Sequence, residues 1–428
     1  MVPLTSFAQH SVGHRDNGQI SCSSSPFRIR WEKSSILSIP SLNRQGGSLM
    51  ITIVGMIGFL TSSRFSTDPL GFRVGGICIS LFLVGLGSGD LRGEAFVSDS
   101  VGYYSVPCLP GSDTIVSVPF QRTPVQQGKL ASLPNLSGSI ASLVPEASPI
   151  FVSRDFLSEP HYLVFRGASS GSGWHFPIVF QDEATLKIEL GQQNLPDLSI
   201  GDVFEVIPYW TLETLFPIGD STIHDSTNLL LSGRGSEILF FDRESASIDL
   251  APSRKFFRTA QGWKEAIRGF PDADQVTIPP GVSFVIRHPA NAASTTFVAF
   301  QKVDSDIKAY PLKTSVDQPR DNHLASVRPV PVKLRNLDLE APAFSESAST
   351  AISDRKDELH VFDNTASAIN RKASAIYFRV GGQWVESDQS QSFPIADDVE
   401  IGPGAGLMVR KVSTADGAQT VWINTPRY

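Results

Sequence analysis

The sequence predicts a mainly β protein, built from antiparallel β-barrel or sandwich domains with an internal duplication, behind an N-terminal leader that lies outside the fold. Three observations predict this: a block that occurs twice, short apolar runs separated by turn residues, and a composition that favours strands. The 428 residues include 34 Gly, 29 Pro and 27 Phe but only 4 Met. Such usage suits many short strands and turns better than long helices.

The repeated block begins at Glu237 and returns at Glu358. From 237 to 263 the offset is a constant 121, and eight of the twenty-seven positions are identical, where composition alone gives roughly two. After a small slip the match resumes, with 276–281 against 399–404 and 284–287 against 407–410. The sequence therefore predicts the same folded unit twice.

Each copy has the pattern of four or five antiparallel strands. Short β-prone runs end at turn residues, and Gly at 262 or 381–382 supplies the positive φ of a hairpin. A unit of this size hides one apolar face and buries little on the other. We therefore expect the copies to pack on each other or on the domain before them.

The first 95 residues differ from the rest. Two apolar runs, 49–60 and 74–87, are each shorter than the roughly 20 residues of a spanning helix. Basic residues precede the second run and Gly93-Glu94-Ala95 follows it, which is the order of a secretory signal. We expect export, with translation starting at an internal Met; a membrane anchor or a buried helix pair is the alternative.

The predicted organisation has five parts. They are a leader, 1–95, with a signal peptide around 74–95; an N-terminal β domain, 96–232; β repeat 1, 233–303; a Pro/Ser-rich connector, 304–355; and β repeat 2, 356–428.

Charge and cysteine content restrict the partners of the exported part. The leader holds eight Lys/Arg and five Asp/Glu, so the net charge changes from −7 to −7 − 3 = −10 when it is removed. An acidic chain without a basic stripe argues against nucleic acid and anionic membranes. Only Cys108 remains in the exported part, and one thiol forms no internal disulfide. Partners are unknown, with envelope proteins or glycans as the candidates, and we expect no membrane span in the mature chain.

The most specific block is 201–217, Gly-Asp-Val-Phe-Glu-Val-Ile-Pro-Tyr-Trp-Thr-Leu-Glu-Thr-Leu-Phe-Pro. It predicts a turn, a strand ending at Pro208 and one helical turn with Thr211 as N-cap. The Tyr209–Trp210 pair has two interpretations. We favour a core plug over a platform for a sugar ring, because the polar residues that a sugar site needs are sparse beside it.

This block belongs to a wider resemblance. Together with Asp113–Phe120, Asp321–Leu324, Arg328–Val332, the two Phe-Asp repeats and the terminal Asn424–Tyr428, it resembles a paralogous family of exported proteins from verrucomicrobial bacteria. The resemblance covers essentially all of 96–428. It implies export and a shared β fold, but no assigned activity and no catalytic residues.

An Arg–Trp pair occurs at equivalent positions in both copies of the repeat. Arg258 and Trp263 in the first copy correspond to Arg379 and Trp384 in the second, each near a repeated Asp at 242 or 363. A structural interpretation has Arg stacking on Trp and pairing with that Asp. The alternative is a pair of equivalent ligand sites, to which Trp210 is a further candidate contributor.

No catalytic, cofactor or metal residues are assigned. Gly167-Ala-Ser-Ser-Gly171 matches Gly-x-Ser-x-Gly, but a strand follows where the nucleophile elbow requires a helix. The histidines lack metal-ligand spacing, and the acidic turns lack the pattern of a calcium loop. We therefore predict a non-enzymatic structural or binding protein of the cell envelope or surface, without a cofactor. An extracellular glycan-binding module or carbohydrate-active enzyme is the alternative.

Overall fold

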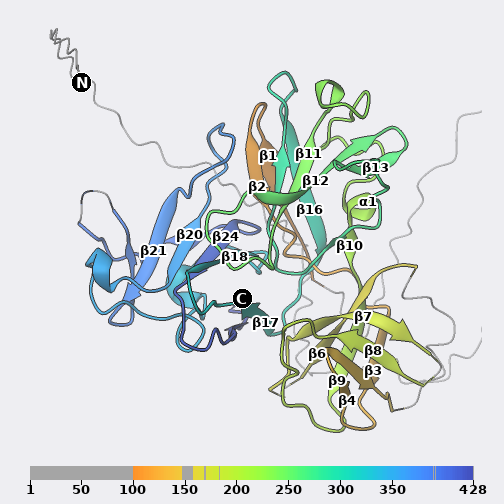
Figure 1. Cartoon of the computed structure of the whole chain (residues 1–428), viewed down its shortest axis with the longest axis vertical. Helices are drawn as coiled ribbons and strands as arrows, with labels where there is room; N and C mark the ends of the chain where they lie inside the picture. Colours follow the sequence, from red (N-terminus) through yellow and green to blue (C-terminus); the bar gives the residue numbers. More distant parts are fainter. Residues whose placement is uncertain are drawn as a thin grey trace, which may run out of the picture. The chain divides into compact units, whose positions relative to one another are not determined.

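A computed structural model describes residues 100–146, 158–167, 170–182, 184–388, 390 and 392–427. The predicted leader, its signal peptide and the internal start lie outside the described residues. The described part belongs to one compact unit, Val97–Tyr428. It consists of several antiparallel sheets with very little helix (Figure 1), so the prediction of a mainly β fold is confirmed.

The first half of this unit contains one five-stranded sheet and two ribbons of two strands each. The sheet has the order β13-β12-β11-β15-β2, and the ribbons are β1-β16 and β10-β14. The strands are β1 (Val101–Cys108), β2 (Asp113–Val116), β10 (Trp210–Thr211), β11 (Glu237–Phe241), β12 (Pro252–Thr259), β13 (Gly262–Glu265), β14 (Thr277–Ile278), β15 (Phe284–Arg287) and β16 (Thr295–Lys302).

The second half has the same arrangement. Its sheet has the order β22-β21-β20-β24-β18, and its ribbons are β17-β25 and β19-β23. The strands are β17 (Lys308–Leu312), β18 (Arg320–Ala325), β19 (Val332–Lys333), β20 (Glu358–Val361), β21 (Ala375–Val380), β22 (Gln383–Glu386), β23 (Glu400–Ile401), β24 (Gly406–Lys411) and β25 (Thr420–Asn424).

The two halves agree in register as well as in strand order. Arg258 pairs with Trp263 across the β12–β13 hairpin, as Arg379 pairs with Trp384 across β21–β22. The hairpins therefore keep the sequence offset of 121, and the strands that follow keep an offset of 123. At the other edge of the sheet, β2 and β18 occupy the same position, each hydrogen-bonded to the strand of the repeated Arg287 or Arg410.

A third sheet is inserted into the first half. Its seven strands have the order β3-β9-β6-β7-β8-β5-β4, and the chain passes through them between β2 and β10. The second half connects β18 to β19 directly, through residues 326–331. The strands are β3 (Gln126–Lys129), β4 (Asn135–Ser137), β5 (Ile140–Leu143), β6 (His161–Arg166), β7 (His175–Gln181), β8 (Leu186–Glu189) and β9 (Val203–Pro208).

Within the described residues, four short helices follow strands or lie in connections. The helix α1 (Leu212–Leu215) begins after Thr211, whose side chain accepts a hydrogen bond from the Thr214 backbone, as the N-cap prediction requires. The others are the 3₁₀ helices η2 (Leu231–Gly233), η3 (Leu334–Asn336) and η4 (Ile352–Asp354). None of the helices in the described ranges is long and apolar enough to cross a membrane.

The strands form sheets that cross the domain boundaries predicted from the sequence. β1 and β2 fall within the predicted domain 96–232, yet they pair with β16 and β15 of the first repeat. The predicted connector, 304–355, supplies β17, β18 and β19 to the second half. Each half is therefore longer than the repeat visible in the sequence, since it also includes β1 and β2, or β17 and β18.

The two halves exchange loops. The loop after β20 reaches the edge strand β2, where the Asp113 amide donates to the Ala368 carbonyl (2.8 Å) and the Asn370 amide donates to the Asp113 carboxylate (2.7 Å). Arg287 lies beside them and binds Asp113 through both Nε and Nη2 (2.6 and 2.8 Å). The same guanidinium donates to the Asn370 side chain.

The equivalent contacts occur in the opposite direction. The loop after β11 reaches β18, where the Asp321 amide donates to the Ser247 carbonyl (3.1 Å) and the Asp249 amide donates to the Asp321 carboxylate (2.7 Å). Arg410 binds Asp321 through Nε and Nη2, and it also binds the Asp249 side chain. The halves therefore meet through two copies of one contact, as subunits do in an isologous dimer.

Candidate functional site

The repeated tryptophans are internal. Trp263 and Trp384 are each 1% exposed. The Trp263 indole donates to the Phe216 carbonyl (3.1 Å), and Trp384 packs on the Phe344 ring, with ring centres 5.1 Å apart. Neither side chain is available as a platform for a sugar ring in this structure.

The repeated arginines are also engaged, but with different partners from the predicted Asp242 and Asp363. Arg258 is 1% exposed and binds Asp225 (2.5 Å) together with four backbone carbonyls. Arg379 binds Glu346 (3.1 Å), which lies 121 residues after Asp225. The acid that pairs with each arginine therefore precedes the repeat that the sequence comparison detected.

Asp242 and Asp363 have another role. Each accepts hydrogen bonds from backbone amides and a hydroxyl just after it, as Asp242 does from Glu244 and Ser245, and Asp363 from Thr365. These bonds lower the pKa of the Asp242 carboxyl, the Ser245 hydroxyl first among them. The repeated Phe-Asp motif thus shapes the turn that ends a strand.

Trp210 lies at the edge of a cleft. Its side chain is partly exposed, its indole donates to the Phe120 carbonyl (3.3 Å), and the Arg122 guanidinium lies 5.7 Å from the ring centre. The neighbouring Tyr209 and Leu212 are buried. The block 209–216 is therefore mostly core, while Trp210 also lines the cleft.

The cleft lies where the inserted sheet and both halves come together. Its empty space is about 670 Å³, part of which opens to solvent. The inserted sheet contributes Tyr162, Arg166 and His175; the first half contributes residues 117–121 and 278–281; the second half contributes Lys308, Tyr310 and residues 325–327. Each of the three parts of the fold thus supplies one wall.

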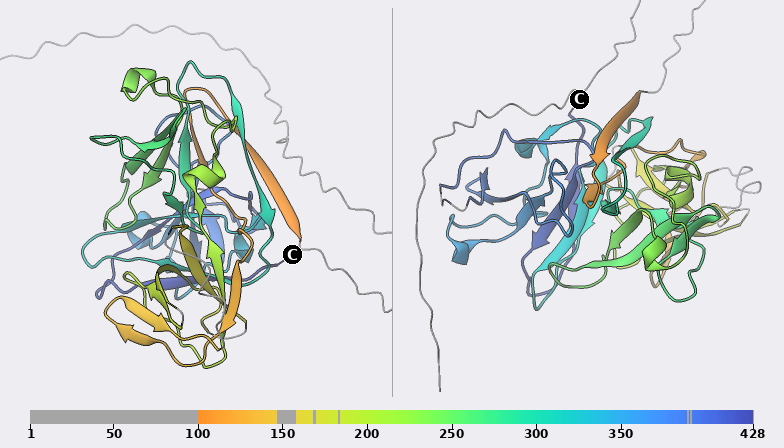
Figure 2. Two further views of the ribbon diagram at one scale, coloured as in Figure 1. Left: turned by 90° about the vertical axis from the view of Figure 1, so that its right-hand side faces the viewer. Right: turned by 90° about the horizontal axis from the view of Figure 1, so that it is seen from above.

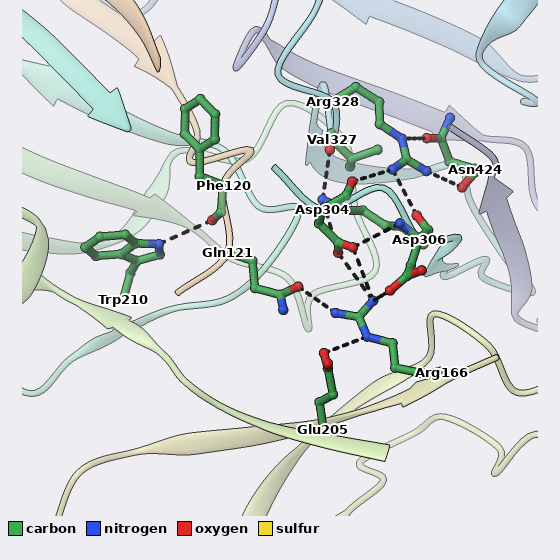
Figure 3. Close-up of polar contacts among 11 residues, drawn as sticks. Phe120, Gln121, Arg166, Glu205, Trp210, Asp304, Asp306, Val327, Arg328 and Asn424 are labelled. Carbon is green, nitrogen blue, oxygen red and sulfur yellow. Dashed lines mark hydrogen bonds and ion pairs between the residues drawn. The ribbon is translucent and has the colours of Figure 1, made fainter. Parts of the chain in front are cut away.

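Arg166 is the centre of the polar groups at this junction (Figure 3). It is 7% exposed, and its Nε binds Glu205 on the neighbouring strand at 2.9 Å. Its Nη2 donates to the Gln121 side chain (2.8 Å), and its Nη1 lies 3.4 Å from Asp304 and 3.3 Å from Asp306. One guanidinium therefore joins the inserted sheet to the segments that follow β2 and β16.

A second arginine fixes the acidic segment from the other side. Arg328 is 2% exposed and binds Asn424 through both its side chain and its carbonyl (2.5 and 2.6 Å). It also donates to the backbone carbonyls of Asp304 and Asp306. This arrangement orients the Asp304 carboxylate toward Arg166 and ties the segment to β25.

Lys308 is the third cation of the group. Its ammonium donates to the Val327 carbonyl (3.0 Å) and lies 3.9 Å from the Asp304 carboxylate. Burial lowers the pKa of Lys308 to about 8, although Asp304 acts in the opposite direction. Burial alone raises the pKa of Asp304, but Lys308 and Arg166 outweigh burial, so that this carboxyl has a lowered pKa.

The uncharged part of the wall is aromatic. The His175 ring lies between Tyr162 and Tyr310, with ring centres 6.1 and 5.5 Å away, and burial lowers its pKa to about 4. Burial also raises the pKa of Tyr162 well above its ordinary value. At neutral pH the cleft therefore presents neutral rings beside charges that are already paired.

One buried hydroxyl in the cleft wall has no hydrogen-bond partner. Ser117 is 1% exposed, and its Oγ bonds to no described group. It does not form the Ser–His pair of a nucleophilic enzyme with His175, although both line the cleft. This oxygen has almost no surface open to the cleft, so a group in the cleft would reach it only if the wall moved.

Other sequence candidates lie elsewhere. Gly167–Gly171 connects the antiparallel strands β6 and β7, as a hairpin loop does, although residues 168 and 169 lie outside the described part. Cys108 is buried. Within the described residues, no group of three or more His, Cys, Asp or Glu side chains could hold a metal ion.

Sequence reasoning did not find the group around Arg166. Arg166, Glu205 and the pair Asp304–Lys308 are far apart in the chain, and none of them belongs to the visible repeat. The available signal was the resemblance, since Arg328 and Asn424 both lie in blocks that carry it.

Comparisons add no relative. No protein-family model matches this chain, and neither a curated protein nor a solved structure matches it.

Proposed function

We propose that this chain is an exported, non-enzymatic binding protein of the cell envelope or surface, and that the junction cleft holds its ligand. One observation carries the proposal: a cleft walled by all three parts of the fold combines aromatic rings with a fixed set of paired polar groups. Ligand sites occur preferentially at such junctions, with a few convergent polar groups in a largely apolar wall.

The cleft favours a neutral, hydroxyl-rich ligand such as a sugar. Its cations and carboxylates are already paired with one another, as Arg166 is with Glu205 and Asp304, so neither an anion nor a cation finds an unmatched charge. Trp210 offers a partly exposed ring, and the buried rings of Tyr162 and Tyr310 line the wall behind it. This assigns the predicted glycan binding to the cleft and not to the repeated tryptophans.

Export rests on the sequence. The basic, apolar and small-residue order of 64–95 supports a secretory signal, and the resemblance to verrucomicrobial exported proteins supports the same localisation. Cell fractionation with an antibody against residues 97–428 tests it. Recovery in the medium or the envelope fraction is expected, and recovery in the cytosol contradicts the proposal.

We also infer that the halves arose by duplication. The equal strand order, the equal hairpin register and the reciprocal contacts at Asp113 and Asp321 support this origin. The inserted sheet then distinguishes the first copy from the second.

A carbohydrate-active enzyme is the rival. Hydrolysis of a glycoside generally needs a carboxylic acid that stays protonated to serve as proton donor, whereas the pKa of Asp304 is lowered by its cationic neighbours. The cleft therefore offers Asp304 as an ionised, fixed acceptor, which suits binding.

Titration calorimetry with a panel of neutral mono- and disaccharides tests the proposal. A saturable heat is expected for at least one sugar, and Trp210→Ala should weaken it. Val332→Ala is the matched control, since Val332 holds the equivalent position, opposite Ile401 as Trp210 is opposite Ile278. Absence of binding across the panel contradicts a sugar site, and shorter products after incubation contradict the non-enzymatic assignment.

A further inference from the structure

The two ribbons at the ends of the halves are equivalent. In the first half Tyr103 lies opposite Phe300, and in the second half Ala309 lies opposite Ile423. The neighbouring pairs agree, since Tyr104 opposite Ala299 corresponds to Tyr310 opposite Trp422. The outer face of β1–β16 thus matches the outer face of β17–β25, residue by residue.

The inserted sheet covers part of the outer face of the second ribbon, although Ile423, opposite Ala309, is 39% exposed. Ala309 is 1% exposed and, together with Val421, packs into the core of the inserted sheet, beside residues such as Trp174. Gly173 approaches so closely that an added Cβ would lie 2.5 Å from the Ile307 carbonyl oxygen. On this half, therefore, the part of the ribbon face around Ala309 and Val421 packs on a β-sheet.

The same face of the first ribbon is bare. Tyr103 is 58% exposed, Phe300 63% and Val298 48%, and Val101 at the start of β1 is 68% exposed. β1, orange in Figure 2, pairs with β16 along its whole length. The outward positions between these residues are Ser105, Pro107 and Thr296, so the face carries no charge before Lys302 at its end.

Such a face is unusual in an unpartnered domain. Natural proteins protect exposed ribbons with charged residues, and contiguous apolar patches on a surface usually mark interaction sites. The aromatic rings of Tyr103 and Phe300 stand where the covered ribbon has Ala309 and Ile423. At this pair of positions the first ribbon therefore carries larger apolar side chains than the second.

We propose that this face binds the same face of a second copy of the chain. A partner must present an apolar, uncharged sheet surface, and the β1–β16 face is itself such a surface. A two-fold axis along the strands brings Tyr103 of one copy onto Phe300 of the other, so that both aromatic contacts form twice. Within one chain, part of the equivalent ribbon face is already buried by packing on a β-sheet.

Sedimentation velocity of the full chain over a range of concentrations tests the proposal. A dimer is expected, and Phe300→Glu or Tyr103→Glu should raise the dissociation constant by roughly ten-fold or more. Leu231→Glu and Ile352→Glu are matched controls, because these side chains are 76% and 82% exposed but lie in η2 and η4. Circular dichroism confirms that each variant folds.

Three results with the full chain and its variants overturn the proposal. They are a monomer at all concentrations, a dimer that resists both ribbon substitutions, and a dimer that η2 and η4 substitutions disrupt as strongly. Dimerisation of residues 97–428 alone, with the full chain monomeric, also overturns it, because the preceding segment would then cover the face. Sugar binding in the cleft should be unchanged by Phe300→Glu, so this test is separate from that of the proposed function.

Discussion

The buried pair Asp357–Lys411 gives the sharpest test of the equivalence between the halves. Asp357 is 0% exposed and Lys411 2%, and they form an ion pair. The equivalent positions in the first half, 121 and 123 residues earlier, hold Ser236 and His288, which form a hydrogen bond of 2.8 Å. One location in the fold thus carries an ion pair in one half and a neutral pair in the other.

Asp357→Ala should destabilise the protein strongly. It leaves the Lys411 ammonium buried with the Ala343 carbonyl, and it removes the acceptor for the amides of Ser345 and Val412. Removing one partner of a buried ion pair costs about 3–5 kcal/mol. Urea unfolding followed by tryptophan fluorescence measures the change in the free energy of unfolding.

The double variant Asp357→Ser, Lys411→His supplies the matched control. It transplants the neutral pair of the first half and should recover about half or more of the lost stability, because no unpaired charge then stays buried. Two results would refute the reasoning. One is a loss below about 1 kcal/mol for Asp357→Ala, typical of an exposed pair; the other is a double variant no more stable than Asp357→Ala.

Three further predictions follow from the buried groups. Arg258→Ala should lose more unfolding free energy than Arg379→Ala in the same urea assay, because Arg258 is 1% exposed and leaves four carbonyls without a donor; equal losses would contradict this. Burial holds the pKa of Lys308 at about 8, so the unfolded chain binds more protons between pH 8 and about 10.4; stability should therefore rise across that window, less so in Lys308→Met, and identical pH profiles would argue against a desolvated lysine. Burial lowers the pKa of His323 to about 4, so its stabilising effect should be present above about pH 6.5 and be lost as pH falls toward 4; His323→Gln should flatten this acid loss, and an unchanged slope would contradict the assignment.

The repeat shows what a single sequence could predict. In residues 237–263 and 358–384, the local sequence pattern indicates a strand, a turn and a hairpin. Both the hairpin and its register could therefore be expected. The Thr211 N-cap was predictable for the same reason. These features depend on interactions between residues that are close in the sequence, and local sequence patterns indicate such interactions well.

The rest depends on contacts between distant segments. A resemblance between 112–118 and 321–327 is visible in the sequence, but it aligns Ser112 with Asp321, whereas the sheets place Asp113 and Asp321 in the same position. A shift of one residue exchanges the two faces of a strand. Likewise, Asp225 is 33 residues from Arg258, and nothing local indicates that they pair.

The inserted sheet accounts for both proposed sites. Without it, residues 117–209 would be a short connection like 326–331, and two similar halves would expose the same ribbon face. The insertion packs on the ribbon of the second half, where Ala309 enters the core of the inserted sheet. Together with both halves, the insertion also forms the walls of the cleft around Arg166. Because there is one insert for two ribbons, the β1–β16 face keeps its apolar surface uncovered by the rest of the described chain. The asymmetry that creates the proposed ligand site on one side therefore leaves the proposed interface for a second molecule on the other.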